Sequence, residues 1–294
     1  MDVQATIARL FVYPVKSCAG VELSEATLTE TGLEFDRAWM VVDEQGIFVT
    51  QRELPRMALI QPELKNLEMV LRAPGMLALH IALDKVEQPT QVMVWSDSVA
   101  AFDMGDVAAQ WFSDFLNTDA TGQRVAVPRK LRLVRFDPEH RRLSSLKWTG
   151  GTEALNQFCD GFAVLVISEA ALDGLNQRLL AVGEAAVGMQ RFRPNIVLAG
   201  VEAHDEDSLD ELHISTFQGL ARLRMVKPCP RCPIPNIDPA TATSTPVVGD
   251  MLQTYRRNEV VGGAVAFGMN AIVVDGVDMA LRVGQSATAD YKFE

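Results

Sequence analysis

The sequence predicts an α+β protein that is predominantly β: a β-barrel domain with a smaller β-rich N-terminal domain packed against it. Two observations carry this prediction. Many short segments have the β-branched and aromatic composition of strands and few have helical periodicity, which favours a barrel or strongly bent sheets. A polar stretch at 117–129, with Gly122 and Pro128, separates two such regions. We therefore predict domains at 1–120 and 121–294.

The N-terminal region begins with strands. Residues 6–12 are rich in β-branched and aromatic side chains and are followed by Pro14, which predicts a strand that ends there. The apolar segments 39–42 and 47–50 flank Asp43-Glu44-Gln45-Gly46. That tetrapeptide suits a type I turn with glycine in the left-handed position, so the two segments predict a hairpin.

Two helices are predicted from apolar residues at helical spacing. The first spans 106–116 and has an N-cap candidate at its start; the second is capped by Ser168 and runs to about Leu180. The apolar positions that define them are Val107, Trp111 and Phe115 in the first helix and Leu172, Leu175 and Leu179 in the second.

The first strand of the second domain is predicted at the continuous apolar run 162–167, which suits a strand buried on both faces. This run leads directly into the second helix. Further strands are predicted at 195–198, at 220–226 and within the glycine-punctuated stretch 260–283.

Composition limits the function classes. A hydrophobic content of 48% with 22% charged residues is typical of a globular chain, and a formal net charge of -11 argues against a nucleic-acid partner. The N-terminus lacks a secretory signal and no segment has the length of a membrane span. Four cysteines are too few for a disulfide framework. We therefore expect a cytoplasmic location with reduced thiols and no membrane association.

The acidic run at 204–211 has two interpretations. It contains Asp205, Glu206, Asp207, Asp210 and Glu211. The simpler interpretation is a solvated loop, and the alternative is a docking patch for a basic redox partner.

The most informative segment is 227–239, which carries Cys229 and Cys232 and has five prolines in thirteen residues. Proline forbids a helix through the segment, and this excludes a thioredoxin-like C-x-x-C, whose second cysteine lies inside a helix. The four histidines have no zinc-site spacing relative to these cysteines, although a zinc site could still assemble in three dimensions.

With these interpretations set aside, the segment is predicted to be a rigid loop that presents thiols beside Lys227 and Arg231. Neighbouring cations stabilise a thiolate, and a thiolate is a soft ligand for a transition metal. The loop thus predicts a thiolate that is fixed in position and could bind a metal, but it does not identify the metal. The alternative is that the cysteines pack as small hydrophobic side chains.

Six segments together resemble the MOSC family, with a MOSC N-terminal β-barrel domain followed by the MOSC domain. The branch that they resemble contains the mitochondrial amidoxime-reducing component and its bacterial relatives. The segments occur in the expected order over nearly the whole chain, at 13–18, 32–43, 50–57, 168–170, 192–197 and 229–239.

The resemblance implies a molybdenum–pterin (Mo-molybdopterin) cofactor between the two domains, with one protein cysteine as metal ligand; pyridoxal phosphate is not expected. The family position aligns with Cys232 rather than Cys229, which then becomes a structural or neighbouring thiol. Cys18 is expected in the core.

The resemblance also implies residues that bind the cofactor. They are Lys16, Ser17, Arg37, Ser168, Arg193, Asn195 and Arg231. Arginine suits phosphate and ring acceptors, and Ser168 would place helix N-terminal amides near an anion. Each also has a structural alternative: Arg37 could merely pair with Asp36 or Asp43, and Ser168 could only cap its helix.

The function that the resemblance implies is molybdenum-dependent reduction of small N-hydroxylated compounds. Cys232 and Asp238 would be catalytic, with Asp238 either delivering protons or only capping a turn. Because no cysteine follows Cys232, an appended iron–sulfur domain is not expected, and electrons would come from a separate ferredoxin-, flavin- or cytochrome-type protein. The alternative is a non-catalytic carrier of molybdenum cofactor or sulfur.

Overall fold

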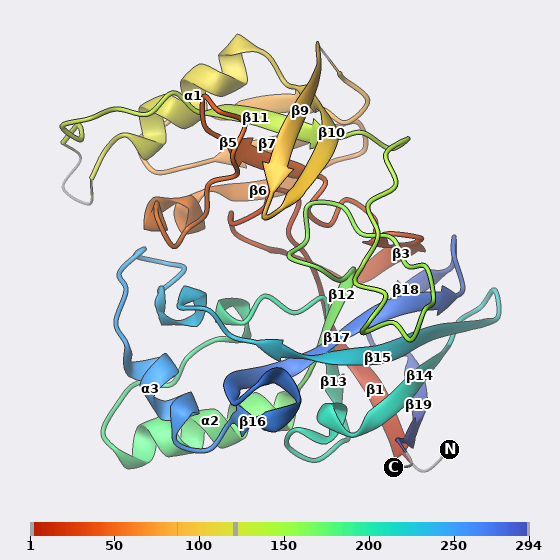
Figure 1. The fold of residues 1–294 in the computed structure, drawn as a ribbon. Helices are drawn as coiled ribbons and strands as arrows, with labels where there is room; N and C mark the ends of the chain where they lie inside the picture. Colours follow the sequence, from red (N-terminus) through yellow and green to blue (C-terminus); the bar gives the residue numbers. More distant parts are fainter. Residues whose placement is uncertain (1–2, 87, 120–122, 293–294) are drawn as a thin grey trace.

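The computed structural model describes residues 3–86, 88–119 and 123–292. The predicted fold class is confirmed: within these residues the chain forms nineteen strands and three α-helices (Figure 1). The predicted boundary between residues 120 and 121 lies outside the described residues and stays a prediction.

A closed barrel of seven strands forms the larger part of the molecule. Its order is β12-β13-β1-β19-β14-β15-β17, and the antiparallel pairing of β12 with β17 closes the ring. Apolar side chains from its strands fill the interior, so the barrel has a packed core. The strands are β1 (Val3–Val12), β12 (Val164–Ser168), β13 (Ile196–Ala199), β14 (Leu209–Ser215), β15 (Leu220–Pro230), β17 (Ala264–Asp275) and β19 (Ser286–Tyr291).

Strand β1 belongs to this barrel although it comes first in the chain. It pairs with β13 on one side and with β19 on the other, so the two ends of the described chain lie side by side (Figure 1). Short strands extend the barrel: β2 (Val21–Leu23) pairs with β1, β16 (Arg257–Asn258) pairs with β17, and β3 (Glu25–Thr29), β4 (Gly32–Leu33) and β18 (Ala280–Arg282) form a small sheet.

Two smaller sheets and one helix form the second β-rich body, at the top of Figure 1. The helix is α1 (Asp106–Leu116) and packs Trp111, Phe112 and Phe115 into a core of its own. The sheets contain β5 (Trp39–Val42), β11 (Arg132–Phe136), β10 (Asp97–Asp103) and β9 (Gln88–Val94), and β6 (Gln61–Leu64), β7 (Glu68–Arg72) and β8 (Leu79–Ala82).

The predicted helices are confirmed, with one correction. Helix α1 has the predicted bounds, but Val107 is exposed and the N-cap is Gly105, which offers no side-chain cap. Helix α2 (Glu169–Ala181) starts at the predicted cap: the Ser168 hydroxyl accepts a hydrogen bond from the Ala171 amide at 3.2 Å. Helix α3 (Val247–Gln253), not predicted, packs against α2.

The interpretation of 204–211 as a solvated loop is wrong. Glu206 is fully buried within a short 3₁₀ turn, Asp205–Asp207, and Asp207 forms an ion pair with Arg256 at 2.5 Å. Strand β14 begins at Leu209. The run therefore connects barrel strands, with one carboxylate buried at Glu206 and a second paired with Arg256.

The buried Glu206 gives the stability a pH dependence. Burial raises the pKa of Glu206 from its ordinary 4.5 to about 7. A raised carboxyl pKa means that the folded state favours the protonated form, so the stabilisation is complete below pH 4.5 and is lost as the pH rises through 7. At about 1.4 kcal/mol per unit of pKa difference, ionisation costs about 3 kcal/mol of folding free energy.

We expect Glu206→Gln to raise the free energy of unfolding at pH 9 by about 3 kcal/mol relative to wild type and to have little effect at pH 4. Urea denaturation at the two pH values measures this difference. The exposed Glu202→Gln is the matched control. A constant difference between wild type and Glu206→Gln across this pH range would show that Glu206 does not titrate near neutrality.

Candidate functional site

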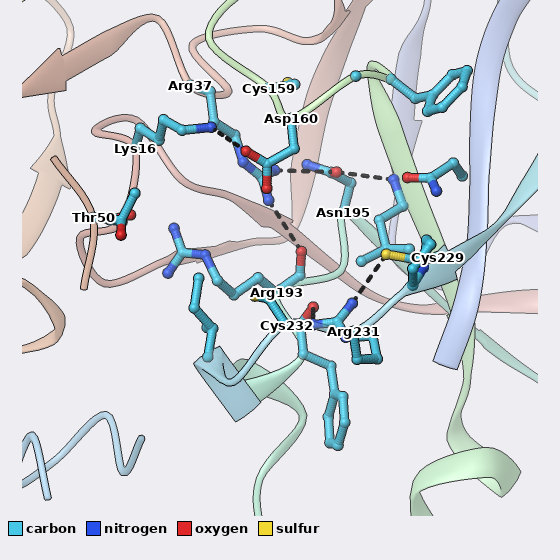
Figure 2. A pocket seen from close by; sticks show the side chains of 18 of the residues that line it. Lys16, Arg37, Thr50, Cys159, Asp160, Arg193, Asn195, Cys229, Arg231 and Cys232 are labelled. Carbon is cyan, nitrogen blue, oxygen red and sulfur yellow. Dashed lines mark hydrogen bonds and ion pairs between the residues drawn. The ribbon is translucent and has the colours of Figure 1, made fainter. Parts of the chain in front are cut away.

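One cavity collects side chains from seven separate parts of the chain (Figure 2). The N-terminal region contributes residues after β1 and on both sides of β5. The remainder come from the segment that leads into β12, from the segment before β13, from the end of β15 and from β17. The polar and sulfur-bearing lining residues are Lys16, Ser17, Arg37, Thr50, Arg52, Cys159, Asp160, Arg193, Asn195, Cys229, Arg231, Cys232 and Asn270.

Lys16 is fixed at this cavity by two hydrogen bonds. It is a buried residue, and its ammonium donates to the Phe158 carbonyl at 2.8 Å and to Asp160 Oδ1 at 2.6 Å. The Asp160 side chain is largely exposed and also accepts from Trp95 Nε1 at 3.3 Å. The pair thus connects the inside of the cavity with its solvent-facing rim.

Three cavity residues that are not glycine have left-handed backbone conformations. The φ angles are 68° at Ser17, 52° at Arg37 and 57° at Arg193. Such conformations are uncommon outside glycine and cost about 1–3 kcal/mol each, so the surrounding structure must impose them. Their concentration here marks the cavity as the functional region.

Asp36 holds Arg37 in place. Its carboxylate is buried; Oδ1 accepts from the Tyr13 amide at 2.8 Å and Oδ2 accepts from Arg37 Nη1 at 2.5 Å. Arg37 Nη2 also donates to the Arg193 carbonyl at 3.2 Å. The guanidinium groups of Arg37 and Arg193 both pack on the Tyr13 ring, 4.4 and 4.2 Å from its centroid.

Asn195 connects these groups to the barrel. Its Oδ1 accepts from Arg37 Nη1 at 3.2 Å and from the Leu165 amide at 3.1 Å, while Nδ2 donates to the Phe11 carbonyl at 3.2 Å. These bonds tie β1 and the start of β12 to the cavity. We assign Asn195 to positioning of Arg37.

The cavity has more cationic donors than internal acceptors. Arg193 Nη1 donates to the Cys18 carbonyl at 2.6 Å, but Nη2 of Arg193 and Nε of Arg231 are buried without a hydrogen-bond partner among the described residues. Burial, together with the charge of Arg37, lowers the pKa of Arg193 to about 10. Unpaired buried donors are costly, so this arrangement favours a bound anion.

The cysteine segment starts as a strand, which corrects the predicted loop. Strand β15 continues to Pro230 with an irregular register opposite β17, and a 3₁₀ turn follows at Ile234–Asn236. Arg231 Nη1 donates to Cys229 Sγ at 3.2 Å, and Cys229 also packs against the core beside α2 and α3. Cys232 is half-buried, lines the cavity and belongs to none of the apolar core clusters of the described residues.

The structure brings together seven of the nine predicted site residues, namely Lys16, Ser17, Arg37, Arg193, Asn195, Arg231 and Cys232. Ser168 is not among them: it is fully buried and caps α2, so its structural alternative describes it. Asp238 lies outside the lining as well. Its Oδ2 accepts from Arg191 Nη2 at 3.0 Å and its Oδ1 from the Ala240 amide, so it caps a turn.

Sequence reasoning missed Asp160, Cys159 and Asn270. Asp160 is recognisable only through its ion pair with Lys16, a residue 144 positions away. Burial, with the nearby charge of Asp36, raises the pKa of Cys159 to about 11, so this thiol is neutral at pH 7. Thr50 and Arg52 lie in one of the segments that carried the family resemblance, and that was the available signal.

Two further observations bear on the alternatives. Within residues 3–86, 88–119 and 123–292 no group of three or more His, Cys, Asp or Glu side chains is placed to hold a metal ion. The described residues therefore do not form the three-dimensional zinc site that the sequence left open. The same residues contain no helix with the length and apolar character of a membrane span.

The molecule combines a seven-stranded barrel, a second β-rich body and a cationic cavity that contains cysteine. These features define its class, and comparison with known families identifies that class. The family model of the MOSC N-terminal beta barrel domain matches residues 4–119, and that of the MOSC domain matches residues 154–288. The chain belongs to the MOSC family.

Its relatives include two kinds of protein. Mitochondrial amidoxime reducing component 2 of Rattus norvegicus is 35% identical over 80% of this chain and 68% of its own length. Mitochondrial amidoxime-reducing component 1 of Homo sapiens is 34% identical over 86% and 72%. Molybdenum cofactor sulfurase of Bos taurus is 30% identical over 86% of this chain but only 29% of its own length.

Proposed function

We propose that this chain binds a molybdenum–pterin cofactor in the cationic cavity and uses it to reduce N-hydroxylated compounds. The observation that carries the proposal is the presence, in one cavity, of a half-buried thiol at Cys232 and of buried guanidinium donors without partners at Arg193 and Arg231. The relatives named for amidoxime reduction support the choice of reaction.

The donor set fits that group. Its phosphate and ring acceptors need cations and forked donors, which Lys16, Arg37, Arg193 and Arg231 supply. Its metal needs a soft ligand, which the Cys232 sulfur would supply. Asn195 keeps Arg37 oriented, and Ser17 offers a hydroxyl at the same wall.

The bound group would supply two-electron redox chemistry at its metal. Reduction of a hydroxylamine consumes two electrons and two protons and releases an amine and water. Apolar Phe162, Leu165 and Phe192 line the cavity and limit access of bulk water. Lys16 Nζ holds a proton at the cavity wall, and its partner Asp160 is exposed at the rim. We therefore assign proton delivery to Lys16, with Asp160 as its counter-ion, rather than to Asp238, which lies outside the cavity lining.

Electrons would come from a separate donor protein of the ferredoxin, flavin or cytochrome type. The direct test supplies them chemically. Protein purified from a host that makes the cofactor should reduce benzhydroxamic acid to benzamide with a reduced viologen dye. Protein from an otherwise identical host that lacks the cofactor is the control. Cofactor-loaded protein that leaves benzhydroxamic acid unchanged would contradict the reductase assignment.

The second candidate is a carrier of molybdenum cofactor or sulfur, which the similarity to a molybdenum cofactor sulfurase favours. In that case Cys232 would carry a persulfide. Mass spectrometry of the intact protein distinguishes the two, because a persulfide adds one sulfur atom to Cys232 and is removed by a reducing agent.

The anion site gives a prediction that needs no turnover. We expect phosphate to raise the melting temperature of the cofactor-free protein, because it satisfies the unpaired donor of Arg193. Arg193→Gln should weaken phosphate binding by about tenfold or more, since charge-assisted hydrogen bonds contribute about 1.5–3 kcal/mol. Exposed Arg141→Gln is the matched control. Equal phosphate responses in the two variants would exclude Arg193 as an anion ligand.

A further inference from the structure

A second recess adjoins the cysteine-bearing cavity, and the function proposed above assigns no ligand to it. It has a volume of about 530 Å³ and shares part of its wall with that cavity, including Asp160, Cys229 and Asn270. Two tryptophans, Trp95 and Trp148, line it. Within the described residues the other two tryptophans are buried in the core beside α1.

Trp95 is held in an uncommon conformation. It is half exposed, and its φ angle of 56° is in the left-handed region, which a bulky side chain rarely adopts. Its indole N–H donates to Asp160 at 3.3 Å, and its ring contacts Phe48 edge-on with centroids 5.1 Å apart. The positive φ belongs to the two-residue turn, 95–96, that joins β9 to β10. An exposed aromatic ring bonded to a rim residue of the cavity is placed to contact a ligand rather than to pack in a core.

Trp148 lies on a segment that is fixed by the contacts of one buried arginine. Arg142 is buried; it pairs with Asp97 at 2.9 Å and donates to the Cys159 carbonyl at 2.7 Å. These bonds fix the chain between β11 and β12, on which Trp148 lies. The Lys227 ammonium lies 4.9 Å from the centroid of the Trp148 ring. The recess therefore has two positioned indole rings.

The charges of the recess limit what it binds. Arg142 is neutralised by Asp97, and Asp160 is neutralised by Lys16. Among the described residues Lys227 has no carboxylate within ion-pair distance, and the Arg52 guanidinium lies 5.0 Å from the centroid of the Trp95 ring. These two cations give the recess a positive charge. A neutral ring that bears a hydrogen-bond acceptor suits this environment better than a cationic one.

We propose that this recess binds the aromatic ring of the substrate, with Trp95 and Trp148 as its specificity-determining residues. The proposal rests on the proposed function, because it places the ring next to the cavity in which the N–O bond would be reduced. Planar rings stack favourably on indole, whereas an aliphatic substituent of the same N-hydroxylated group gains less from the two tryptophans.

The test compares two hydroxamic acids and one product that cannot be reduced further. In the cofactor-loaded protein, Trp95→Leu and Trp148→Leu should each raise KM for benzhydroxamic acid by about tenfold, with the KM for acetohydroxamic acid little changed. Each variant should also weaken the binding of benzamide, measured by calorimetry, by about tenfold. Phe217→Leu, at an exposed aromatic residue outside the recess, is the control.

Two results would overturn the proposal. One is an unchanged benzamide affinity together with unchanged KM values in both tryptophan variants. The other is a loss of molybdenum from either folded variant, because the recess would then hold the cofactor and not the substrate. If neither hydroxamic acid is reduced but benzamide binding still depends on Trp95 and Trp148, the ring site stands and the reductase assignment fails.

Discussion

Replacing Cys232 with alanine should reduce the molybdenum content of the purified protein to below about a tenth of wild type. The reason is that the other two thiols of the cavity are engaged elsewhere: Cys159 is buried with a raised pKa, and Cys229 accepts from Arg231 and packs against the core. Cys232 is then the thiol best placed to act as the soft ligand. N–O reduction should be lost in parallel. Metal analysis by mass spectrometry, on samples of equal protein concentration, measures the effect.

Cys229→Ala is the matched control for this prediction. Cys229 accepts a hydrogen bond from Arg231 and packs against the core beside α2 and α3, so its removal should leave most of the molybdenum in place. Equal losses in the two variants would show that Cys232 is not the distinctive ligand. A loss confined to Cys229→Ala would reverse the assignment.

Removing the carboxylate of Asp36 should have the largest effect on stability. Asp36 is buried and pairs with Arg37, and the Arg193 guanidinium packs on the same Tyr13 ring as Arg37. Asp36→Ala would leave two adjacent cations without their counter-charge, and breaking a buried ion pair in this way costs about 3–5 kcal/mol. We expect a fall of about 10 °C in melting temperature for a chain of this size.

Asp36→Asn provides the second arm of that experiment. The amide keeps an acceptor for the Tyr13 N–H but loses the charge, so its destabilisation should be smaller than that of Asp36→Ala. Exposed Glu34→Ala controls for loss of a carboxylate in the same segment. If Asp36→Ala unfolds at the wild-type urea concentration, then the pairing with Arg37 contributes nothing to the fold.

Local patterns in the sequence predicted the elements whose stability is local. Helix α1 has the predicted bounds because Trp111 and Phe115 recur at helical spacing, and α2 starts at Ser168 because that hydroxyl caps its first turn. The family resemblance predicted seven residues that line one cavity. Composition alone would not have found these residues, because they come from distant parts of the chain.

Long-range pairing decided what the sequence did not predict. Strand β1 lies in the barrel between β13 and β19, and no local pattern specifies those partners. Glu206 lies in an acidic run whose composition is typical of a solvated loop. It is buried because the turn between two barrel strands places its side chain in the interior. In the sequence Asp160 is indistinguishable from an ordinary surface carboxylate, and its role is indicated only by its ion pair with Lys16 in the structure.

The most direct test of the central claim is the metal and pterin content of the wild-type protein made in a cofactor-producing host. If the cationic cavity with Cys232 holds a molybdenum–pterin group, the purified chain should contain close to one molybdenum atom and one pterin per molecule. Protein from that host that folds normally but carries neither molybdenum nor pterin would contradict the account.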